Sequence, residues 1–147
     1  MAEERRLVTV HLIKVCVGIE SIAHLAQVQK GRRKGGKNAV IHYTRHMPKR
    51  ADELLDGGSM FWIIKGLVAV RQRLVGFATE HFEDEGDYCA IRLDRELVPV
   101  EPRPRRPHQG WRYLAAEEAP ADLKAGKGGA AKMPPELIAE LKQLGLL

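Results

Sequence analysis

The sequence has 147 residues, a formal net charge of +5 and 44% hydrophobic residues, which suits one domain with its own core. No apolar stretch approaches the roughly 20 residues of a membrane helix, and the N-terminal residues lack the apolar run of a signal peptide. The two cysteines, Cys16 and Cys89, lie in apolar stretches, where thiols are usually buried and reduced. We therefore expect a cytoplasmic protein with no membrane partner and no disulfide.

Hydrophobic periodicity predicts the elements of the first half of the chain in order. They are a strand at residues 7–17, a helix at 21–31, a basic loop at 31–38, a strand at 39–44 and a short helix at 48–55. Ser21 is a suitable N-cap for the first helix, and Gly31 is its stop signal. Pro48 suits the first turn of the second helix, because its missing N–H would have no partner there.

The second half of the chain is dominated by strand signals. The predicted strands are residues 60–65, 67–77, 88–93, 97–100 and 111–114. An acidic hairpin turn is expected at residues 83–87. Three prolines should prevent regular pairing across residues 101–110 and make them a stiff, extended loop.

Several short strands with only short helices favour an α+β fold. We expect a small mixed, mostly antiparallel sheet, or a partly closed pseudobarrel, with short peripheral helices. Residues 1–123 should form the single globular domain. The composition of residues 124–133 predicts a flexible Gly/Ala/Lys linker, and the pattern of residues 134–147 predicts a C-terminal amphipathic helix.

Five segments resemble a family of uncharacterised proteins of about this length from alphaproteobacteria. They are residues 44–50, 56–66, 70–73, 105–114 and 119–123. That family has no assigned function, so this resemblance implies none. The run Phe61–Lys65, followed by a long basic strand, is also similar in pattern to the EVE and PUA-like pseudobarrels. The second resemblance implies an aromatic-lined cleft that binds RNA or modified bases in DNA.

Positive charge is segregated along the chain, because no acidic residue occurs from Ser21 to Ala51, while acid gathers at residues 80–87 and 117–122. Arginine clamps phosphate or stacks on a base, and an indole or phenol ring offers a face to an unstacked base. These residue types predict a nucleic-acid site. Its members are Arg45, Lys49, Arg50, Trp62, Lys65, Arg71, Arg73, Arg105, Arg106, Gln109, Trp111, Arg112 and Tyr113.

The same residues have a structural interpretation, which stays open. Trp111 and Tyr113 could fill the interior, the arginines could be solvated or paired with the acidic clusters, and Trp62 could be a core residue that shares a strand face with Ile64.

The sequence therefore favours a nucleic-acid-binding module for RNA or a modified base. One alternative is a small hydrolase or transferase acting on a nucleotide-like anion, with His46 or His108 as general base near Asp56, and with Lys65 and Arg71 stabilising the anion. Another is a protein-interaction domain that docks through the C-terminal helix. No catalytic motif is present, the six histidines show no metal-ligand spacing, and no cofactor is expected.

Overall fold

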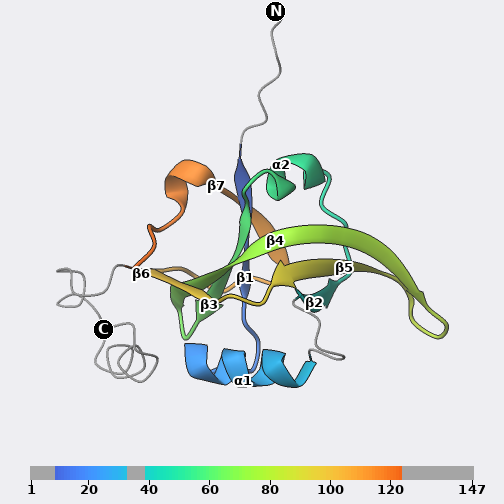
Figure 1. The fold of residues 1–147 in the computed structure, drawn as a ribbon, viewed down its shortest axis with the longest axis horizontal. Helices are drawn as coiled ribbons and strands as arrows, with labels where there is room; N and C mark the ends of the chain where they lie inside the picture. Colours follow the sequence, from blue (N-terminus) through green and yellow to red (C-terminus); the bar gives the residue numbers. More distant parts are fainter. Residues whose placement is uncertain (1–8, 33–38, 124–147) are drawn as a thin grey trace, which may run out of the picture.

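The computed structural model describes residues 9–32 and 39–123 (Figure 1). Within these ranges the elements follow one another as β1 (Val10–Val15), α1 (Ile22–Arg32), β2 (Ala39–Thr44), α2 (Ala51–Leu55), β3 (Ser59–Ile64), β4 (Leu67–Phe82), β5 (Gly86–Asp94), β6 (Val98–Pro104), β7 (Trp111–Ala115) and a short 3-10 helix (Ala116–Glu118). The predicted linker at 124–133, the predicted helix at 134–147 and most of the predicted basic loop lie outside the described residues.

The strands form one open sheet in the order β2-β5-β4-β3-β1-β7, and β6 pairs with β4 beside this path. The β1–β3 pair is parallel, and the other strand pairs within the described ranges are antiparallel. The expected α+β fold with a mostly antiparallel sheet and short peripheral helices is therefore confirmed at this level.

The sheet bends because β4 belongs to both of its halves. The first half of this 16-residue strand pairs with β3 and β6, and its second half pairs with β5. The register of the β4–β5 pair shifts between Leu74 and Gly76, and such an irregularity bends a strand and increases its twist. Beyond this point the two strands project from the body as a long hairpin, on the right of Figure 1.

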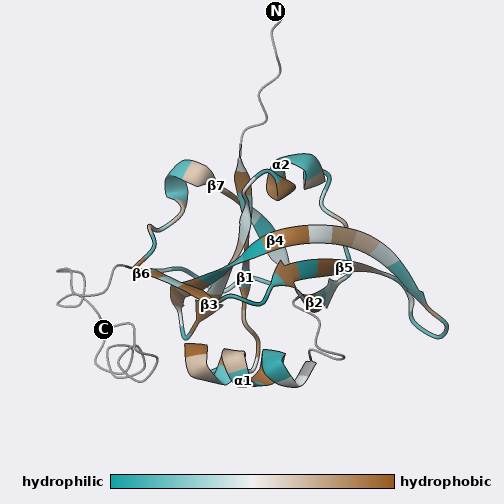
Figure 2. Cartoon of the chain, viewed as in Figure 1, coloured by the Kyte–Doolittle hydropathy of each residue, from teal (hydrophilic) through white to brown (hydrophobic). Residues whose placement is uncertain are grey.

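Both faces of the central strands are buried, which explains the continuous apolar run of β3. Alternate side chains of β1 and β3 enter two core clusters: Leu12, Met60 and Trp62 lie in the larger one, and Ile13 and Phe61 in the smaller one. Figure 2 shows the apolar residues gathered in the body of the sheet and the polar residues at the end of the hairpin.

Helices α1 and α2 cover opposite ends of the larger core cluster, α1 below and α2 above it in Figure 1. The predicted N-cap is confirmed, because the Ser21 Oγ accepts a hydrogen bond from the His24 N–H at 3.0 Å. The helix continues through Gly31 to Arg32, so the predicted stop was one residue early. Helix α2 begins at Ala51, after the buried Pro48 and not at it.

Gly58 allows α2 to lie close to β1. A Cβ atom at this position would lie 2.4 Å from the backbone oxygens of both Leu54 and Val10, so no larger residue fits without backbone movement. The Gly58 N–H also donates to the Leu54 carbonyl at 2.9 Å, which ends the helix.

Two sequence predictions about strands were wrong. β4 runs to Phe82, five residues beyond the expected end, because the hairpin partner β5 continues to pair with it as far as Gly86. β6 runs through Pro102 to Pro104, where no regular pairing was expected. The prolines are accommodated because β6 is an edge strand with an irregular register against β4.

Candidate functional site

Trp62 lies in the core and not on an open surface. Its side chain is 3% exposed, and its indole Nε1 donates to the Gln72 Oε1 at 2.9 Å. Gln72 and Gln29 of α1 exchange two further amide hydrogen bonds, at 2.7 and 2.8 Å, and Gln72 also donates to the Asp94 carbonyl. This buried network satisfies the indole N–H and joins α1 to the sheet, so the Trp62 ring cannot serve as an exposed stacking platform.

Three of the predicted cations have carboxylate partners. Arg71 makes two 2.7 Å hydrogen bonds to Asp122, and Arg50 makes a similar pair with Glu53. These hydrogen bonds lower the pKa of both carboxyl groups. Lys65 lies 3.6 Å from Glu20 on the surface, and with a φ of 52° it forms the β3–β4 turn together with Gly66. These three side chains already have carboxylate partners and are therefore less available to a ligand.

Trp111 and Tyr113 of β7 attach the segment that follows β2. The Trp111 Nε1 donates to the His46 carbonyl at 3.0 Å, and the Tyr113 hydroxyl accepts from the Arg50 N–H at 3.2 Å. The two rings meet edge to face with centroids 5.0 Å apart, and the Arg50 guanidinium lies over the Tyr113 ring. Both rings are partly buried and pack against the larger core cluster, so their role is largely structural.

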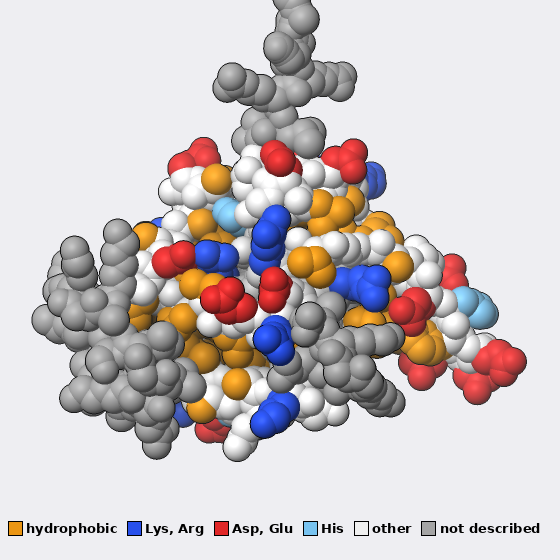
Figure 3. Space-filling model, viewed as in Figure 1, with side chains coloured by type: hydrophobic (Ala, Val, Ile, Leu, Met, Phe, Trp, Pro, Cys, Tyr) orange, Lys and Arg blue, Asp and Glu red, His pale blue; other side chains and the backbone are white. Residues whose placement is uncertain are grey.

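The remaining predicted residues outside the β6–β7 loop are dispersed. Arg45 lies 4.4 Å from the centroid of the Tyr88 ring and donates to the Glu85 and Asp87 carbonyls, so it stabilises the projecting hairpin. Lys49 is exposed beyond β2, and Arg73 lines a polar groove with Asp94 and other acidic residues. The hairpin ends in the acidic turn that the sequence predicted, which appears as a red cluster in Figure 3.

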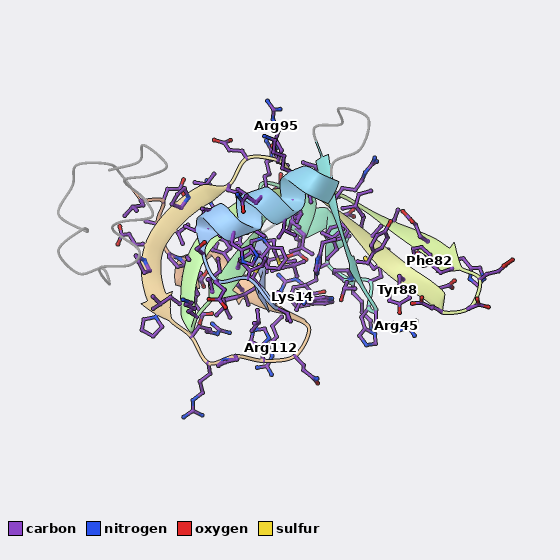
Figure 4. All side chains as sticks on the ribbon, turned by 90° about the horizontal axis from the view of Figure 1, so that it is seen from below. Lys14, Arg45, Phe82, Tyr88, Arg95 and Arg112 are labelled. Atoms are coloured by element: carbon purple, nitrogen blue, oxygen red, sulfur yellow. The ribbon has the colours of Figure 1, made fainter. Side chains whose placement is uncertain are left out.

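The structure does bring cations together around the loop between β6 and β7. An open hollow of about 400 Å³ lies between the end of β1 and this loop, lined by Lys14, Val15, Val17 and residues 107–110. Arg106 and Gln109 are exposed on the loop, Arg105 precedes them, and Arg112 is exposed on β7. Figure 4 shows Lys14 between α1 and the loop, with Arg112 beside the loop.

His108 adds a hydrogen-bonding group to this hollow. Its Nδ1 lies 3.1 Å from the Gly110 carbonyl, which assigns the proton to Nδ1, and its buried Nε2 has no hydrogen-bond partner in the described part of the chain. Burial and the nearby Arg112 lower the pKa of His108, so the neutral ring with an Nε2 acceptor is favoured.

A second, more enclosed cavity of about 120 Å³ adjoins the hollow on the α1 side. It shares Lys14, Val15 and Val17 with the hollow, and its other walls come from α1, β2 and Trp62. The His42 ring meets the Trp62 ring edge to face, with centroids 5.2 Å apart. We call the hollow and this cavity together the Lys14 cleft.

Lys14 is the residue that sequence reasoning missed. It pairs with Trp62 on β3 and with Trp111 on β7, so its side chain leaves the sheet on the same face as both indoles. Burial lowers its pKa, and no carboxylate of residues 9–32 or 39–123 forms an ion pair with it. A half-buried ammonium without a counterion is a favourable partner for an anion or a carbonyl oxygen.

Arg71, Lys65 and His46, which the enzymatic alternative assigns, do not line this cleft. Arg71 is bound to Asp122, Lys65 is paired with Glu20, and His46 is exposed. No group of three or more His, Cys, Asp or Glu side chains in the described ranges could hold a metal ion. No described helix is long and apolar enough to cross a membrane.

His11, which contacts Ser59 as Arg71 does, is expected to make the fold sensitive to acid. Its Nδ1 accepts the Ser59 N–H at 3.0 Å, and burial, followed by the charge of Arg71, lowers its pKa. The folded-state pKa of His11 is below the ordinary value of about 6.5. The contribution of the neutral ring to the free energy of unfolding is therefore fully present above about pH 6.5 and is lost as the pH falls below it. We expect the free energy of unfolding to decrease between about pH 7 and about pH 5, with a smaller decrease in His11→Gln, as measured by urea denaturation. The exposed His46→Gln variant serves as the control, and an unchanged decrease in His11→Gln would contradict this role.

The fold and the cleft define an α+β protein with a bent, open sheet and a cationic cleft at the end of its first strand. The chain belongs to the family described as "Protein of unknown function (DUF1489)", whose model matches residues 12–147. Neither a curated protein nor a solved structure matches the chain.

Proposed function

We propose that the protein binds nucleic acid, RNA in preference to DNA, in the Lys14 cleft. The observation that supports this proposal is a set of cations without carboxylate partners around one hollow. Lys14 lines the hollow, Arg105 and Arg106 lead into the loop that lines it, and Arg112 follows that loop. None of the four forms an ion pair with a described carboxylate, in contrast to Arg50, Lys65 and Arg71.

The chemistry of such a set suits a phosphate backbone. Arginine donates two parallel hydrogen bonds to phosphate oxygens, and each neutralised phosphate releases counterions, which drives association. The loop is held at its start by the Arg105 N–H, which donates to the Gly66 carbonyl at 3.0 Å, and it leads directly into β7. A loop anchored at both ends loses less conformational entropy when it binds a ligand.

The lining of the cleft suits an unpaired base more than a duplex. The enclosed cavity is bordered by Trp62, His42 and aliphatic side chains of α1, and it is too narrow for a base pair. RNA is usually recognised through single-stranded, unstacked bases held against flat or apolar side chains. A cleft of this kind in a bent sheet is also what the resemblance to EVE and PUA-like domains implies, and that likeness is part of this proposal.

Fluorescence anisotropy with a labelled single-stranded RNA of about 12 nucleotides tests the proposal. If four cations meet phosphates, the logarithm of the association constant should fall with the logarithm of salt concentration with a slope of about −3. An unlabelled DNA of the same sequence, used as a competitor, measures the preference for RNA. Binding that does not change with salt, or no binding at low salt, would overturn the proposal.

A further inference from the structure

We propose that the α1-side cavity of the Lys14 cleft holds a single oxo-pyrimidine base, uracil or thymine, while the phosphate of the same nucleotide lies in the loop-side hollow. This inference rests on the nucleic-acid binding proposed above and specifies which nucleotide the site prefers. Three properties of the cavity support this inference: its position beside the hollow, its size, and the hydrogen-bond donors and acceptors on its walls.

The two parts of the cleft lie next to each other, because Lys14, Val15 and Val17 line both. One side of the cleft is enclosed and bordered by aromatic and aliphatic side chains. The other is open and lined by the β6–β7 loop, where the charges of Arg105 and Arg112 act on His108 and Arg106 is exposed. A nucleotide has the same polarity, with a flat base at one end and an anionic phosphate at the other. The Lys14 side chain lies where these two parts meet.

The volume of the cavity favours a base with a single ring over a base with two fused rings. Its volume of about 120 Å³ is close to that of an apolar cavity of about 150 Å³ which admits a benzene ring. A purine has two fused rings and would require α1 to move away from the sheet. That movement is opposed by the two hydrogen bonds between Gln29 of α1 and Gln72 of β4.

The His42 ring on the wall can donate or accept a hydrogen bond, but Lys14 and the two glutamines offer a donor more readily than an acceptor. The Gln72 Oε1 already accepts from both Gln29 and Trp62, and the Gln29 Oε1 accepts from Gln72. Lys14 contributes an ammonium, which has three donors and no acceptor. A base carbonyl oxygen therefore satisfies Lys14 and offsets the cost of burying its charge. Uracil and thymine carry a carbonyl oxygen on both edges, whereas cytosine carries one carbonyl and, on the other edge, an amino group that would meet the cation.

The inference is tested by comparing oligomers of about 12 uridines, cytidines and adenosines in the same anisotropy assay. We expect the uridine oligomer to bind about tenfold more tightly than the other two, the discrimination typical of one well-formed base contact. Lys14→Met should reduce this preference, because methionine keeps much of the side-chain volume and removes the donor.

The variant Val28→Phe tests the contribution of the cavity to base preference independently of the contribution of the charged side chains. Val28 lines the cavity from α1, so a phenylalanine there fills it without changing net charge. The preference for uridine should disappear, while the salt dependence of binding stays as in the unmodified protein. Gln27→Phe, at an exposed position of the same helix, is the matched control and should keep the preference. If Val28→Phe does not fold, Ile41→Phe fills the cavity from β2.

The outcomes distinguish the two proposals. Equal, salt-dependent binding of all three oligomers would overturn the base cavity and leave the nucleic-acid proposal standing. A uridine preference that survives both cavity-filling variants would also overturn it, because the preference would then arise elsewhere. If no oligomer binds, the proposed function fails, and the base cavity fails with it.

Discussion

Gln72→Leu is expected to lower the free energy of unfolding by about 3 kcal/mol, because the change leaves buried polar groups in the core without hydrogen-bond partners. Gln72 is 0% exposed, and it is the partner of the Trp62 indole N–H and of both polar ends of the Gln29 amide. A buried donor or acceptor without a partner costs about 1–3 kcal/mol, and leucine satisfies none of these groups. Urea denaturation, followed by tryptophan fluorescence, measures the change.

The double variant Gln29→Leu/Gln72→Leu is the control for this explanation. When both amides are removed, the Trp62 N–H is the main side-chain group left without a hydrogen-bond partner. The double variant should therefore be more stable than Gln72→Leu alone by about 1 kcal/mol. If Gln72→Leu costs less than about 0.5 kcal/mol, the network does not hold the core in the way its geometry indicates.

The network also matters for the Lys14 cleft. Gln29 belongs to α1, whose residues Leu25, Val28 and Gln29 form one wall of the enclosed cavity. The hydrogen bonds to Gln72 fix this wall relative to Trp62 on the other side. The same side chains that stabilise the core therefore set the width of the cavity.

The local sequence pattern predicted those elements whose burial and end signals are local in the sequence. The run from Met60 to Ile64 is buried on both faces and was predicted as a strand, and Ser21 was predicted as the cap of α1. The start of β4 was also correct, but its end was not. Beyond Phe77 that strand is stabilised by pairing with β5 in the projecting hairpin, and single-strand hydrophobic patterns do not show such pairing.

The site was harder to predict because its parts come together through the topology. The sequence left open whether Arg71 binds a ligand or pairs with an acidic cluster, because its partner Asp122, in the cluster at 117–122, lies 51 residues further along the chain. For Trp62 the sequence allowed either a stacking platform or a core residue, and the structure places it in the core, where its indole joins a network with α1.

Lys14 carried a weak signal that could have been used. It is a charged residue within a mostly apolar strand, and it alternates with the core residues Leu12 and Cys16 so that it faces the same side of the sheet. An inward-facing lysine on a strand indicates a polar partner or a cavity, and this pattern points to a site. Its neighbours Trp62 and Trp111 become apparent only when β1 is paired with both β3 and β7.

The central claim is that nucleic acid binds at the β6–β7 loop and not through the net charge of the whole protein. Arg106→Ala/Arg112→Ala removes two exposed cations beside the hollow, and Arg92→Ala/Arg95→Ala removes two exposed cations elsewhere. In Figure 4, Arg95 and Arg112 project on opposite sides of the molecule. Each double variant loses two positive charges from the same net charge of +5, so general electrostatic attraction changes equally.

The most direct test is therefore the affinity of both double variants for the same RNA of about 12 nucleotides at one salt concentration. Two exposed phosphate contacts worth about 1 kcal/mol each predict a roughly thirtyfold weaker association for Arg106→Ala/Arg112→Ala. The salt slope of that variant should also be smaller by about 1.4, whereas Arg92→Ala/Arg95→Ala should change affinity by less than about threefold. Equal losses in the two variants would contradict a localised site, and no loss in either would contradict RNA binding through these residues.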